Sequence, residues 1–579
     1  MSILKNLKAA SSLEDLAAIL GYKPSALAYI VYKVSPGSKY TKFTIPKKSG
    51  GVREICAPIE PLKTLQRRVA NVLYACRHEI DGASGRRPLS HGFRQDLSIV
   101  TNARRHKRRR YVLNLDLQDF FPTFNFGRVR GFFIHNNSLK LNEKVATIIA
   151  QIACFENMLP QGSPCSPIIA DLIAHLLDVR LAQLAKKHQL TYSRYADDLT
   201  FSTSRRDFPA SLAAPVATGS PQWMPGADLA NAITTAGLKI NPDKTRMQFR
   251  SSRQLVTGLT VNSKVNVRPE YYRLARAMCN SLFEMGAYHL PPVAPPPLGG
   301  AASATAPPAL ITSLGKLEGI LSHIHHVKDT VDERDGLEKR KHATAARKLY
   351  ARFLKYRYFV RLERPLIVCE GKTDNLYLKY ALRNLPAFHP KLGSWKGAVF
   401  TSAISFFSYK NQAHQILELG GGAGDLRYFF IQNRYKRDIH SFKHRPLKHP
   451  VIVLVDNDDG GKDLFKTISS NYGIVIDYKS PIPFFHVTDN LYLIKTPELG
   501  ASGISCIEDF FEPSLLKTEL EGKKFNPDKD YDAGGEYGKT AFAEKVVRAN
   551  ATKINFSGFG PLFDRIAAVI DHYKPPAAI

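Results

Sequence analysis

Short apolar runs along the chain predict strands, and several of these runs carry or end in acidic residues. Residues 112–117 predict one strand, and residues 195–201 predict a hairpin with two adjacent acids inside an apolar and aromatic run. Residues 366–369 and 451–455 are continuous apolar runs of the kind found in fully buried strands. Strands and helices alternate after residue 362, and this alternation predicts a parallel sheet.

Two stretches interrupt this pattern. Residues 205–228 and 290–308 are rich in Pro, Ala, Ser and Gly and lack periodicity, so we expect surface insertions rather than parts of a core. Residues 317–358, by contrast, have a helical and charged pattern. We expect a multidomain chain of α/β and α+β class. Its predicted domains are residues 1–265, 266–360 and 361–579.

The charge balance is the strongest global indication of a partner. Lys and Arg number 81 against 51 Asp and Glu, which gives a formal net charge of +30. Such an excess favours a polyanionic partner, most often nucleic acid, with a generally basic surface as the alternative. The longest apolar runs fall far short of the roughly 20 residues that cross a bilayer, so no membrane partner is expected.

The cysteines and the N-terminal stretch indicate the compartment. The 7 cysteines are scattered, with no pair at CxxC spacing, so neither a zinc site nor a disulfide framework is expected. The N-terminal stretch has acids inside its apolar part and no clear cleavage site, unlike a signal peptide. Together these features predict a protein of the reducing cytoplasm.

Three acidic residues form the first candidate site. Asp116 interrupts the apolar strand at 112–117, and Asp197 and Asp198 lie in the hairpin at 195–201. A carboxylate on an apolar strand is costly to bury unless it is paired or binds a cation. Three carboxylates brought together would hold two Mg²⁺ ions, one to activate an attacking hydroxyl and one to stabilise a leaving pyrophosphate. The pattern therefore favours nucleotidyl transfer.

These acids belong to a series of motifs that resembles reverse transcriptases, in family order. The motifs lie at residues 43–53, 116–121, 159–167, 195–201 and 241–245. The resemblance implies a right-hand fold of fingers, palm and thumb, RNA-directed DNA polymerase activity, dNTP substrates and two Mg²⁺ ions at the three acids. It makes Phe121 a steric gate against a ribose 2′-hydroxyl, and it leaves open a structural role for Lys244. The implied nucleotide-binding residues are Lys47, Arg53, Phe121, Gln161, Gly162 and Lys244.

Two further strings narrow the resemblance to retron reverse transcriptases. Residues 102–106 match the NAxxH element of that family, and residues 256–258 match its VTG element. Such enzymes copy part of a structured noncoding RNA from a 2′-hydroxyl of an internal guanosine, which yields a branched RNA–DNA molecule. A group II intron or diversity-generating reverse transcriptase is the alternative, and a solvated turn is the alternative for the basic run at 104–110. The implied RNA-binding residues are Asn102, His106, Arg108, Arg109, Arg110, Val256, Thr257 and Gly258.

A second group of acids follows the two buried strands predicted in the last third of the chain. Glu370 follows the first strand, and Asp456 and Asp458 follow the second. Because the carboxyl ends of parallel strands line one crevice, these acids are expected to bind one or two Mg²⁺ ions and act on phosphodiesters. The arrangement resembles a TOPRIM domain, the Rossmann-like module of topoisomerases, primases and several nucleases. The resemblance adds Glu508 as a metal ligand, with Asp374 and Lys539 as supporting residues.

The two halves together resemble a retron reverse transcriptase fused to a nuclease effector of antiphage defence. The implied partners are the retron noncoding RNA, its branched DNA product, dNTPs, and host or phage nucleic acid as the effector's target, RNA or DNA. Two alternatives stay open for the C-terminal module. It could process only the enzyme's own product, or it could be a nucleic-acid-binding platform. The sequence of the RNA partner and a homo-oligomeric state also stay open.

Overall fold

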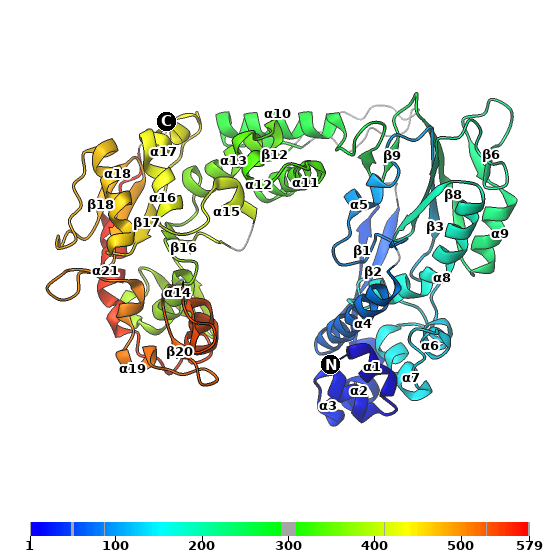
Figure 1. Cartoon of the computed structure of the whole chain (residues 1–579), viewed down its shortest axis with the longest axis horizontal. Coiled ribbons are helices and arrows are strands. Elements are labelled where there is room, and N and C mark those ends of the chain that lie inside the picture. Colours follow the sequence, from blue (N-terminus) through cyan, green and yellow to red (C-terminus); the bar gives the residue numbers. More distant parts are fainter. Residues whose placement is uncertain are drawn as a thin grey trace. The chain divides into compact units, whose positions relative to one another are not determined.

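The computed structural model describes residues 2–47, 51–85, 87–290, 309–409, 412–528 and 530–576. Contacts between residues divide the chain into two compact units (Figure 1). Unit 1 comprises Met1–Pro269 with Val327–Glu333, and unit 2 comprises Glu270–His326 with Arg334–Ile579. Residues 291–308 of the second predicted insertion lie outside the described ranges. Within those ranges, no helix is long and apolar enough to cross a membrane.

Unit 1 is built on a four-stranded antiparallel sheet with the order β4-β5-β3-β8. Its strands are β4 (Thr191–Tyr195), β5 (Asp198–Thr203), β3 (Tyr111–Gln118) and β8 (Lys239–Phe249). The strand predicted at residues 112–117 is β3, which lies inside the sheet with β5 and β8 on either side. All four of its aliphatic side chains are buried, which explains the nearly continuous apolar run. A separate antiparallel hairpin, β1 (Tyr40–Pro46) and β2 (Val52–Pro58), precedes the sheet in sequence.

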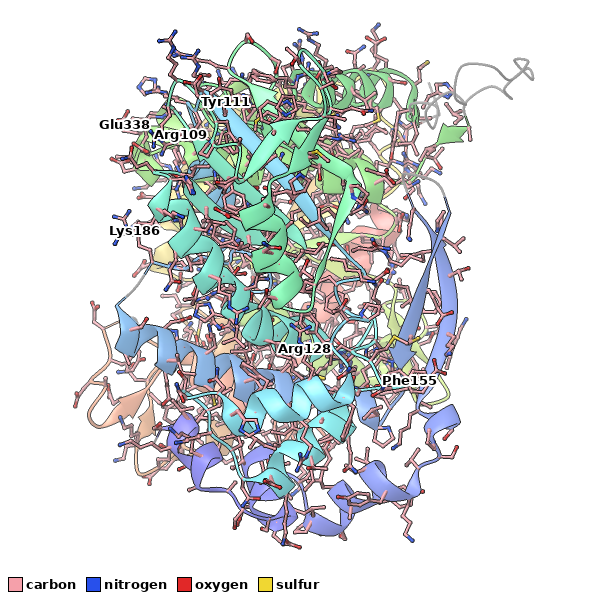
Figure 2. All side chains as sticks on the ribbon, turned by 90° about the vertical axis from the view of Figure 1, so that its right-hand side faces the viewer. Arg109, Tyr111, Arg128, Phe155, Lys186 and Glu338 are labelled. Atoms are coloured by element: carbon pink, nitrogen blue, oxygen red, sulfur yellow. The ribbon has the colours of Figure 1, made fainter. Side chains whose placement is uncertain are left out.

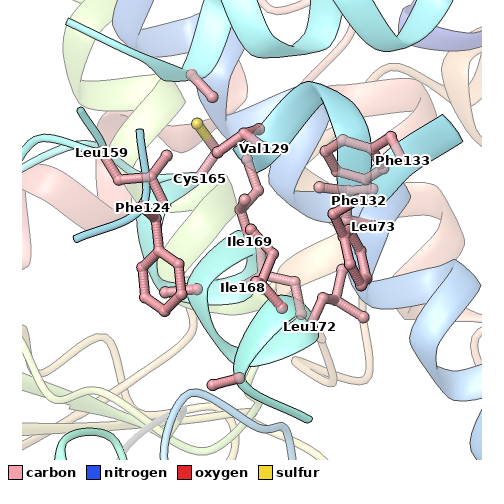
Figure 3. Close-up of a cluster of buried hydrophobic side chains, with 14 of the residues drawn as sticks. Leu73, Phe124, Val129, Phe132, Phe133, Leu159, Cys165, Ile168, Ile169 and Leu172 are labelled. Atoms are coloured by element: carbon pink, nitrogen blue, oxygen red, sulfur yellow. The ribbon is translucent and has the colours of Figure 1, made fainter. Parts of the chain in front are cut away.

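Helices form much of the core of unit 1. They are α1 (Ile3–Ala9), α2 (Leu13–Leu20), α3 (Pro24–Ala28), α4 (Leu62–Ser84), α5 (Ile99–Arg104), α6 (Phe126–His135), α7 (Glu143–Ala153), α8 (Ser166–Lys187) and α9 (Ala227–Thr235). Figure 3 shows Leu73 of α4, Phe132 of α6 and Ile168 of α8 in one buried apolar cluster. Helix α8 contacts β4 as well as α4, α6 and α9. A helix enclosed in this way needs apolar residues all round rather than on one face.

The stretch at residues 205–228 is anchored to the core. It contains a short hairpin, β6 (Ala213–Pro215) and β7 (Trp223–Pro225). Leu212 and Ala213 are 0% and 1% exposed and belong to the apolar core of unit 1. The Trp223 ring lies 6.1 Å from that of Phe208 and 6.2 Å from that of Phe249 in β8. The expectation of a purely surface insertion is therefore wrong here, because its few large apolar side chains pack against the sheet.

Unit 2 contains the parallel sheet expected from the alternating pattern. Its five strands have the order β16-β13-β17-β19-β18, with only the edge strand β18 antiparallel to its neighbour. The strands are β13 (Leu366–Cys369), β16 (Ser405–Phe406), β17 (Val451–Val455), β18 (Phe485–Thr488) and β19 (Leu491–Lys495). Every residue of β13, β17 and β19 is buried. Parallel strands covered on both faces have this continuous apolar character.

Helices cover this sheet. The helices from residue 269 onward are α10 (Pro269–Met285), α11 (Gly315–Val331), α12 (Gly336–Lys341), α13 (Ala345–Lys355), α14 (Asp374–Asn384), α15 (Gln412–Leu417), α16 (Ala423–Phe430), α17 (Arg434–His440), α18 (Lys462–Tyr472), α19 (Pro513–Leu516), α20 (Lys539–Ala541) and α21 (Gly560–His572). Ile367 of β13 and Ile452 of β17 share one apolar cluster with Tyr377 of α14 and Leu562 of α21. Helices α14 and α21 therefore pack on the same face of the sheet.

The C-terminal end of α10 packs within the same unit as the parallel sheet. The ring of Phe283 lies 5.5 Å from that of Tyr356 and 5.0 Å from that of Phe442. The Arg352 guanidinium lies 4.8 Å from the centre of the Phe283 ring, a distance at which cation and ring attract each other. Residues 266–360 are the region expected to form the thumb. Of these, residues 270–326 and 334–360 share a compact unit with the C-terminal sheet.

Candidate functional sites

Three acids meet at the ends of β3 and β5 in unit 1. Asp116 of β3 is paired with Asp198 of β5 across the sheet. Asp197 lies in the turn between β4 and β5, where Ala196 has a φ of 56°. The Leu117 N–H donates to the Asp197 carbonyl oxygen at 3.0 Å and ties this turn to β3. The structure therefore brings together the three carboxylates that the sequence singled out.

A buried arginine holds the turn in place by a hydrogen bond to its backbone. Arg194 is fully buried, and its Nη1 donates to the Ala196 carbonyl oxygen at 3.0 Å. Its Nη2 lies 2.8 Å from Asp171 Oδ1 and 2.7 Å from Asp178 Oδ2, both on α8. Burial opposes ionisation of Asp178, but the Arg194 guanidinium keeps the pKa of that carboxyl far below its usual range.

Sequence analysis missed this network, although a signal was present. Arg194 stands in the short strand before the two acids, and a buried guanidinium requires carboxylate partners. Asp171 and Asp178 are seven residues apart on a helix, so they lie on the same face. An arginine in a strand and two acids at this spacing in the preceding helix predict a buried ion pair.

The charges of the turn acids repel one another. Loss of hydration and then the charges of Asp197 and Asp116 raise the pKa of Asp198 to about 7. Burial and then Asp116 raise the pKa of Asp197. Lys244 of β8 offsets part of this charge, because its Nζ lies 2.9 Å from Asp116 Oδ1 and 3.0 Å from Oδ2. Carboxylates held together in this way favour a bound cation.

These acids fit a divalent cation by their chemistry. In the described part of the chain, no three His, Cys, Asp or Glu side chains are arranged to hold a metal ion as they stand. At Asp116 the ammonium of Lys244 supplies the positive charge instead. Carboxylate oxygens are the protein ligands that Mg²⁺ prefers, and three carboxylates exceed what one lysine neutralises. Asp116, Asp197 and Asp198 are the residues that would hold Mg²⁺, with Lys244 displaced from Asp116.

The β1–β2 hairpin contacts the loop expected to shape the nucleotide pocket. The Cys56 N–H donates to the Gln161 carbonyl oxygen at 2.8 Å. Gly162 has a φ of 120°, and a Cβ there would lie 2.8 Å from the Cys56 carbonyl oxygen, so only glycine fits. Arg53 of β2 lies close enough for its charge to counteract the raised pKa of Asp197. Lys47, by contrast, is an exposed residue at the end of β1.

Phe121 is half-buried a few residues beyond Asp116. Its ring lies 5.7 Å from that of Phe93 and 5.6 Å from that of Phe120. Phe93 has a φ of 57°, an unusual backbone conformation for a large side chain. The Phe93 ring contacts the Phe121 ring. Phe93 was not singled out from the sequence, because no local sequence pattern indicates this contact.

The NAxxH residues form a buried network rather than a surface. Asn102 and His106 are both 0% exposed. The two ring nitrogens of His106 lie 2.7 Å from the hydroxyls of Ser202 and Ser193, and the Ser193 hydroxyl donates to Asn102 Oδ1 at 2.6 Å. Burial and then nearby arginines lower the pKa of His106 to about 3, so it is neutral. These two buried side chains join α5 to β4 and β5, and their role in RNA binding stays a prediction.

The VTG residues lie against the same helix. Thr257 and Gly258 have φ values of 47° and 80° and form the turn between β9 (Leu255–Val256) and β10 (Leu259–Thr260). The Thr257 hydroxyl donates to the carbonyl oxygen of Ile99 in α5 at 3.2 Å. Val256 is buried, whereas Gly258 is exposed. The two short elements that indicated a retron enzyme are therefore neighbours in space.

The basic run between α5 and β3 differs from its buried neighbours. Arg108 and Arg110 are exposed, while Arg109 is half-buried, with its Nη2 donating to the Thr191 hydroxyl at 3.2 Å. Figure 2 shows Arg109 next to Tyr111, where the run enters β3. Arg108 is fixed by a 3.0 Å hydrogen bond from Nε to the Ser263 carbonyl oxygen, which leaves its positive charge uncompensated. Two of the three arginines are thus available to phosphates.

Unit 2 brings the second group of acids to the carboxyl ends of its parallel strands. Glu370 follows β13, and its Oε1 and Oε2 accept the N–H groups of Ala423 at 3.1 Å and Asp456 at 3.2 Å. Asp456 follows β17, and its Oδ1 accepts the Ile507 N–H at 2.9 Å. Asp458 lies two residues further on, and its charge helps to raise the pKa of Glu370 after the larger effect of burial.

Two more acids and one lysine complete this group. Burial, followed by the charges of Asp374 and Glu370, raises the pKa of Asp456 to about 9. Burial and then Glu508 raise the pKa of Asp374 to about 7. Lys539 Nζ binds Glu508 Oε2 at 2.9 Å, while Glu508 Oε1 is buried with no hydrogen-bond partner among the described residues. Five acids and a single lysine leave an excess of negative charge that fits a divalent cation.

The comparisons with known proteins agree with the motifs of unit 1. The reverse transcriptase (RNA-dependent DNA polymerase) family matches residues 45–262. Retron Mx65 reverse transcriptase of Myxococcus xanthus is 36% identical over 288 residues, which are 46% of this chain and 61% of that protein. Retron Ec86 reverse transcriptase of Escherichia coli is 32% identical over 283 residues, 47% of this chain and 78% of that protein.

This chain belongs to the retron reverse transcriptase family, as its motifs indicated. The chain spans less than two thirds of the length of the Mx65 relative, of which 61% is matched. Among solved structures, apo telomerase from Candida Tropicalis, truncated from its C-terminal domain, matches 43% of this chain and 61% of its own, with a TM-score of 0.28 and 14% identity. That likeness is too weak to carry an argument.

The buried Arg194 pair should dominate the stability of unit 1. Asp178→Asn leaves the guanidinium without its main charge partner, and breaking a buried pair in this way costs about 3–5 kcal/mol. Because the pKa of Asp178 is lowered by folding, its contribution is complete above about pH 4 and declines as the pH falls further. Urea unfolding at pH 7 should therefore show a large decrease in the free energy of unfolding of Asp178→Asn.

The exposed pair of Arg130 and Glu143 provides the control. Glu143→Gln removes an ion pair of similar length, 3.0 Å, whose carboxylate is 74% exposed. The free energy of unfolding should therefore decrease by less than about 1 kcal/mol. Equal losses for Asp178→Asn and Glu143→Gln would contradict the supporting role of the buried network.

Proposed function

We propose that this chain is the RNA-directed DNA polymerase of a retron and that it makes branched RNA–DNA from a structured noncoding RNA. The observation that carries this proposal is the pairing of Asp116 with Asp198 beside Asp197, within the residues that match the reverse transcriptase family. Mg²⁺ bound there would supply the positive charge that activates the attacking hydroxyl and stabilises the leaving pyrophosphate. Arg53 and the loop at Gln161 and Gly162 would bind the incoming dNTP.

The steric constraints support the same proposal. Gly162 permits a close approach between its loop and the β1–β2 hairpin, so that the nucleotide would be enclosed by two backbones. The Phe121 ring contacts the Phe93 ring, and this contact would help to hold it in a position where it excludes a 2′-hydroxyl. Lys244, which pairs with Asp116 beside the turn acids, would offer a positive charge to the pyrophosphate.

Branched DNA synthesis should depend on the turn acids. The double variant Asp197→Asn with Asp198→Asn keeps the shape of the turn but removes two negative charges, so Mg²⁺ affinity and DNA synthesis should fall by at least about 100-fold. Asp207→Asn, an exposed acid of the same unit, is the matched control and should retain synthesis. The measurement is branched DNA recovered from cells on a denaturing gel. Normal amounts from the double variant would rule out this site.

The salt dependence of RNA affinity should distinguish the role of the exposed Arg108 and Arg110 from that of the buried His106. Replacing Arg108 and Arg110 by Gln removes two phosphate contacts, so the slope of log affinity against log salt should become shallower by about 1.5. The melting temperature should not change. His106→Ala should show the reverse: a lower melting temperature from the broken network and, after correction for folded fraction, an unchanged slope. An unchanged slope in the double arginine variant would exclude this surface.

For the C-terminal module, the proposed function is that of a Mg²⁺-dependent TOPRIM nuclease effector in antiphage defence, as in the Ec67-like branch of retron reverse transcriptases. Support comes from the acids at the carboxyl ends of β13 and β17, from their raised pKa values, and from the buried, unpartnered Glu508 Oε1. Lys539, fixed by Glu508, would offer a cation to the phosphate in the transition state. The target would be host or phage nucleic acid.

Two rivals share this geometry. In the first, the module only processes the branched product. In the second, it binds nucleic acid without cutting it. The second rival is less favourable, because five grouped acids would repel the phosphates of a bound nucleic acid.

One substitution separates the three possibilities. Glu370→Gln keeps the shape and can still accept one backbone N–H, but it removes one negative charge from the metal site. The effector proposal predicts branched DNA of normal length and loss of phage protection by about tenfold or more in plaque assays. The processing rival predicts longer branched DNA. The exposed Glu519→Gln is the control, and normal DNA with normal protection in Glu370→Gln would leave only the binding platform.

A further inference from the structure

Unit 2 holds a cavity of about 770 Å³ that neither acidic site uses. Four segments enclose it: residues 312–315 before α11, residues 357–366 leading into β13, one face of α14, and residues 400–406 around β16. Its volume lies within the range of sites for small ligands, about 300–1,000 Å³. The charged side chains in its lining are Arg357, Arg361, Arg364, Lys379, Arg383 and Glu363.

The cavity lies at the opposite end of the sheet from the acids of unit 2. Its lining includes Leu366, the first residue of β13, whereas Glu370 follows the last residue of that strand. At about 3.3 Å per residue, four residues of strand separate the two positions by about 13 Å. The cavity is therefore a distinct site, and a ligand in it would not be bound by the acids.

The charge of the cavity is strongly positive. Five cationic side chains face one lining carboxylate, Glu363, and one neighbouring carboxylate, Glu318, which pairs with Arg357. Arg361 and Arg364 are fixed by neutral groups: the first donates to the Gly286 carbonyl oxygen at 2.9 Å and the second to that of Ser402 at 2.7 Å. A carbonyl orients a guanidinium without neutralising it. These two arginines are thus held in place with their charge uncompensated.

Aromatic rings lie among these cations. Phe400 and Phe406 are half-buried residues of the lining, and the Phe400 ring also lies 5.3 Å from that of His389 and 5.2 Å from that of Trp395. The Arg383 guanidinium lies 5.9 Å from the centre of the Phe400 ring, and Lys379 Nζ lies 5.4 Å from that of Phe406. Rings next to oriented arginines are the combination that binds a base by stacking and its phosphate by charge-assisted hydrogen bonds. A plain phosphate site would not need the rings.

We propose that this cavity binds a phosphorylated nucleoside, with the base against Phe400 or Phe406 and the phosphate among Arg361, Arg364 and Arg383. The source is a free nucleotide or the terminal nucleotide of a nucleic-acid strand, which share this chemistry. The site goes beyond the polymerase and the nuclease and does not rest on either. Because its walls come from the segment before α11, from α14 and from the sheet edge, a bound nucleotide joins the α10–α11 region to the sheet.

The test uses the full-length protein with EDTA, because a site built from cations needs no metal whereas both acidic sites do. Calorimetry compares AMP, a 5′-phosphorylated tetranucleotide, the same tetranucleotide without its phosphate, inorganic phosphate and adenosine. AMP should bind, adenosine should not, and the 5′-phosphorylated tetranucleotide should bind more tightly than AMP only if a strand end is the source. The unphosphorylated tetranucleotide reports general binding to the basic surface.

Charge reversal assigns the binding to this cavity. Lys379→Glu with Arg383→Glu replaces two exposed cations of α14, so AMP affinity should fall by about tenfold or more. Lys436→Glu with Lys466→Glu changes the net charge equally at exposed positions of α17 and α18 outside the cavity, and AMP affinity should stay within about twofold. Phe400→Ala should lower the affinity for AMP several-fold but leave the affinity for inorganic phosphate unchanged. This comparison reports the contribution of stacking separately from that of charge.

Two results would overturn the proposal. One is the absence of AMP and tetranucleotide binding in EDTA at millimolar concentration. The other is an equal effect of the cavity pair and the control pair. Failure here would leave branched DNA synthesis and its dependence on Asp197 and Asp198 untouched, and loss of that synthesis would leave the EDTA-resistant binding untouched, so the two proposals fail independently.

Discussion

The structure depends on holding like charges together at the ends of apolar strands. In unit 1, Asp116, Asp197 and Asp198 converge where β3 and β5 end, and in unit 2, Glu370 and Asp456 converge where β13 and β17 end. Burial disfavours each carboxylate, and each raises the pKa of its neighbours. Each unit pairs one lysine with these acids, Lys244 with Asp116 and Lys539 with Glu508. The remaining negative charge is what a metal ion would neutralise.

The two units position their acids by different physical means. In unit 1 the turn is fixed from below by a side-chain network, because Arg194 binds the Ala196 carbonyl oxygen and two buried acids of α8. In unit 2 the carboxylates are fixed by main-chain N–H groups, as for Glu370 and Asp456. A side-chain network depends on every partner, since loss of one leaves a buried charge. Backbone donors are retained whatever the sequence, so the second site tolerates more variation around it.

Sequence patterns predicted the elements that carry chemistry better than the contacts that hold them. The strand at 112–117, the hairpin acids and the parallel sheet were expected from apolar runs, whose meaning is local. The partners of Arg194 lie on a helix 16 and 23 residues earlier in the chain, where only the spacing of two acids indicates them. The pairing of His106 with Ser193 and Ser202 spans about 90 residues, so no local pattern contains it. Residues 205–228 had the composition of a loop, yet a few apolar side chains anchor them to the core.

The packing of α10 has a mechanical consequence. Phe283 near its C-terminal end lies among Tyr356 and Phe442, and all three rings are buried. The exposed Arg352 lies against the Phe283 ring. Close-packed aromatic contacts do not deform continuously, so this end of α10 is held to the segments around Tyr356 and Phe442, which lead into β13 and β17.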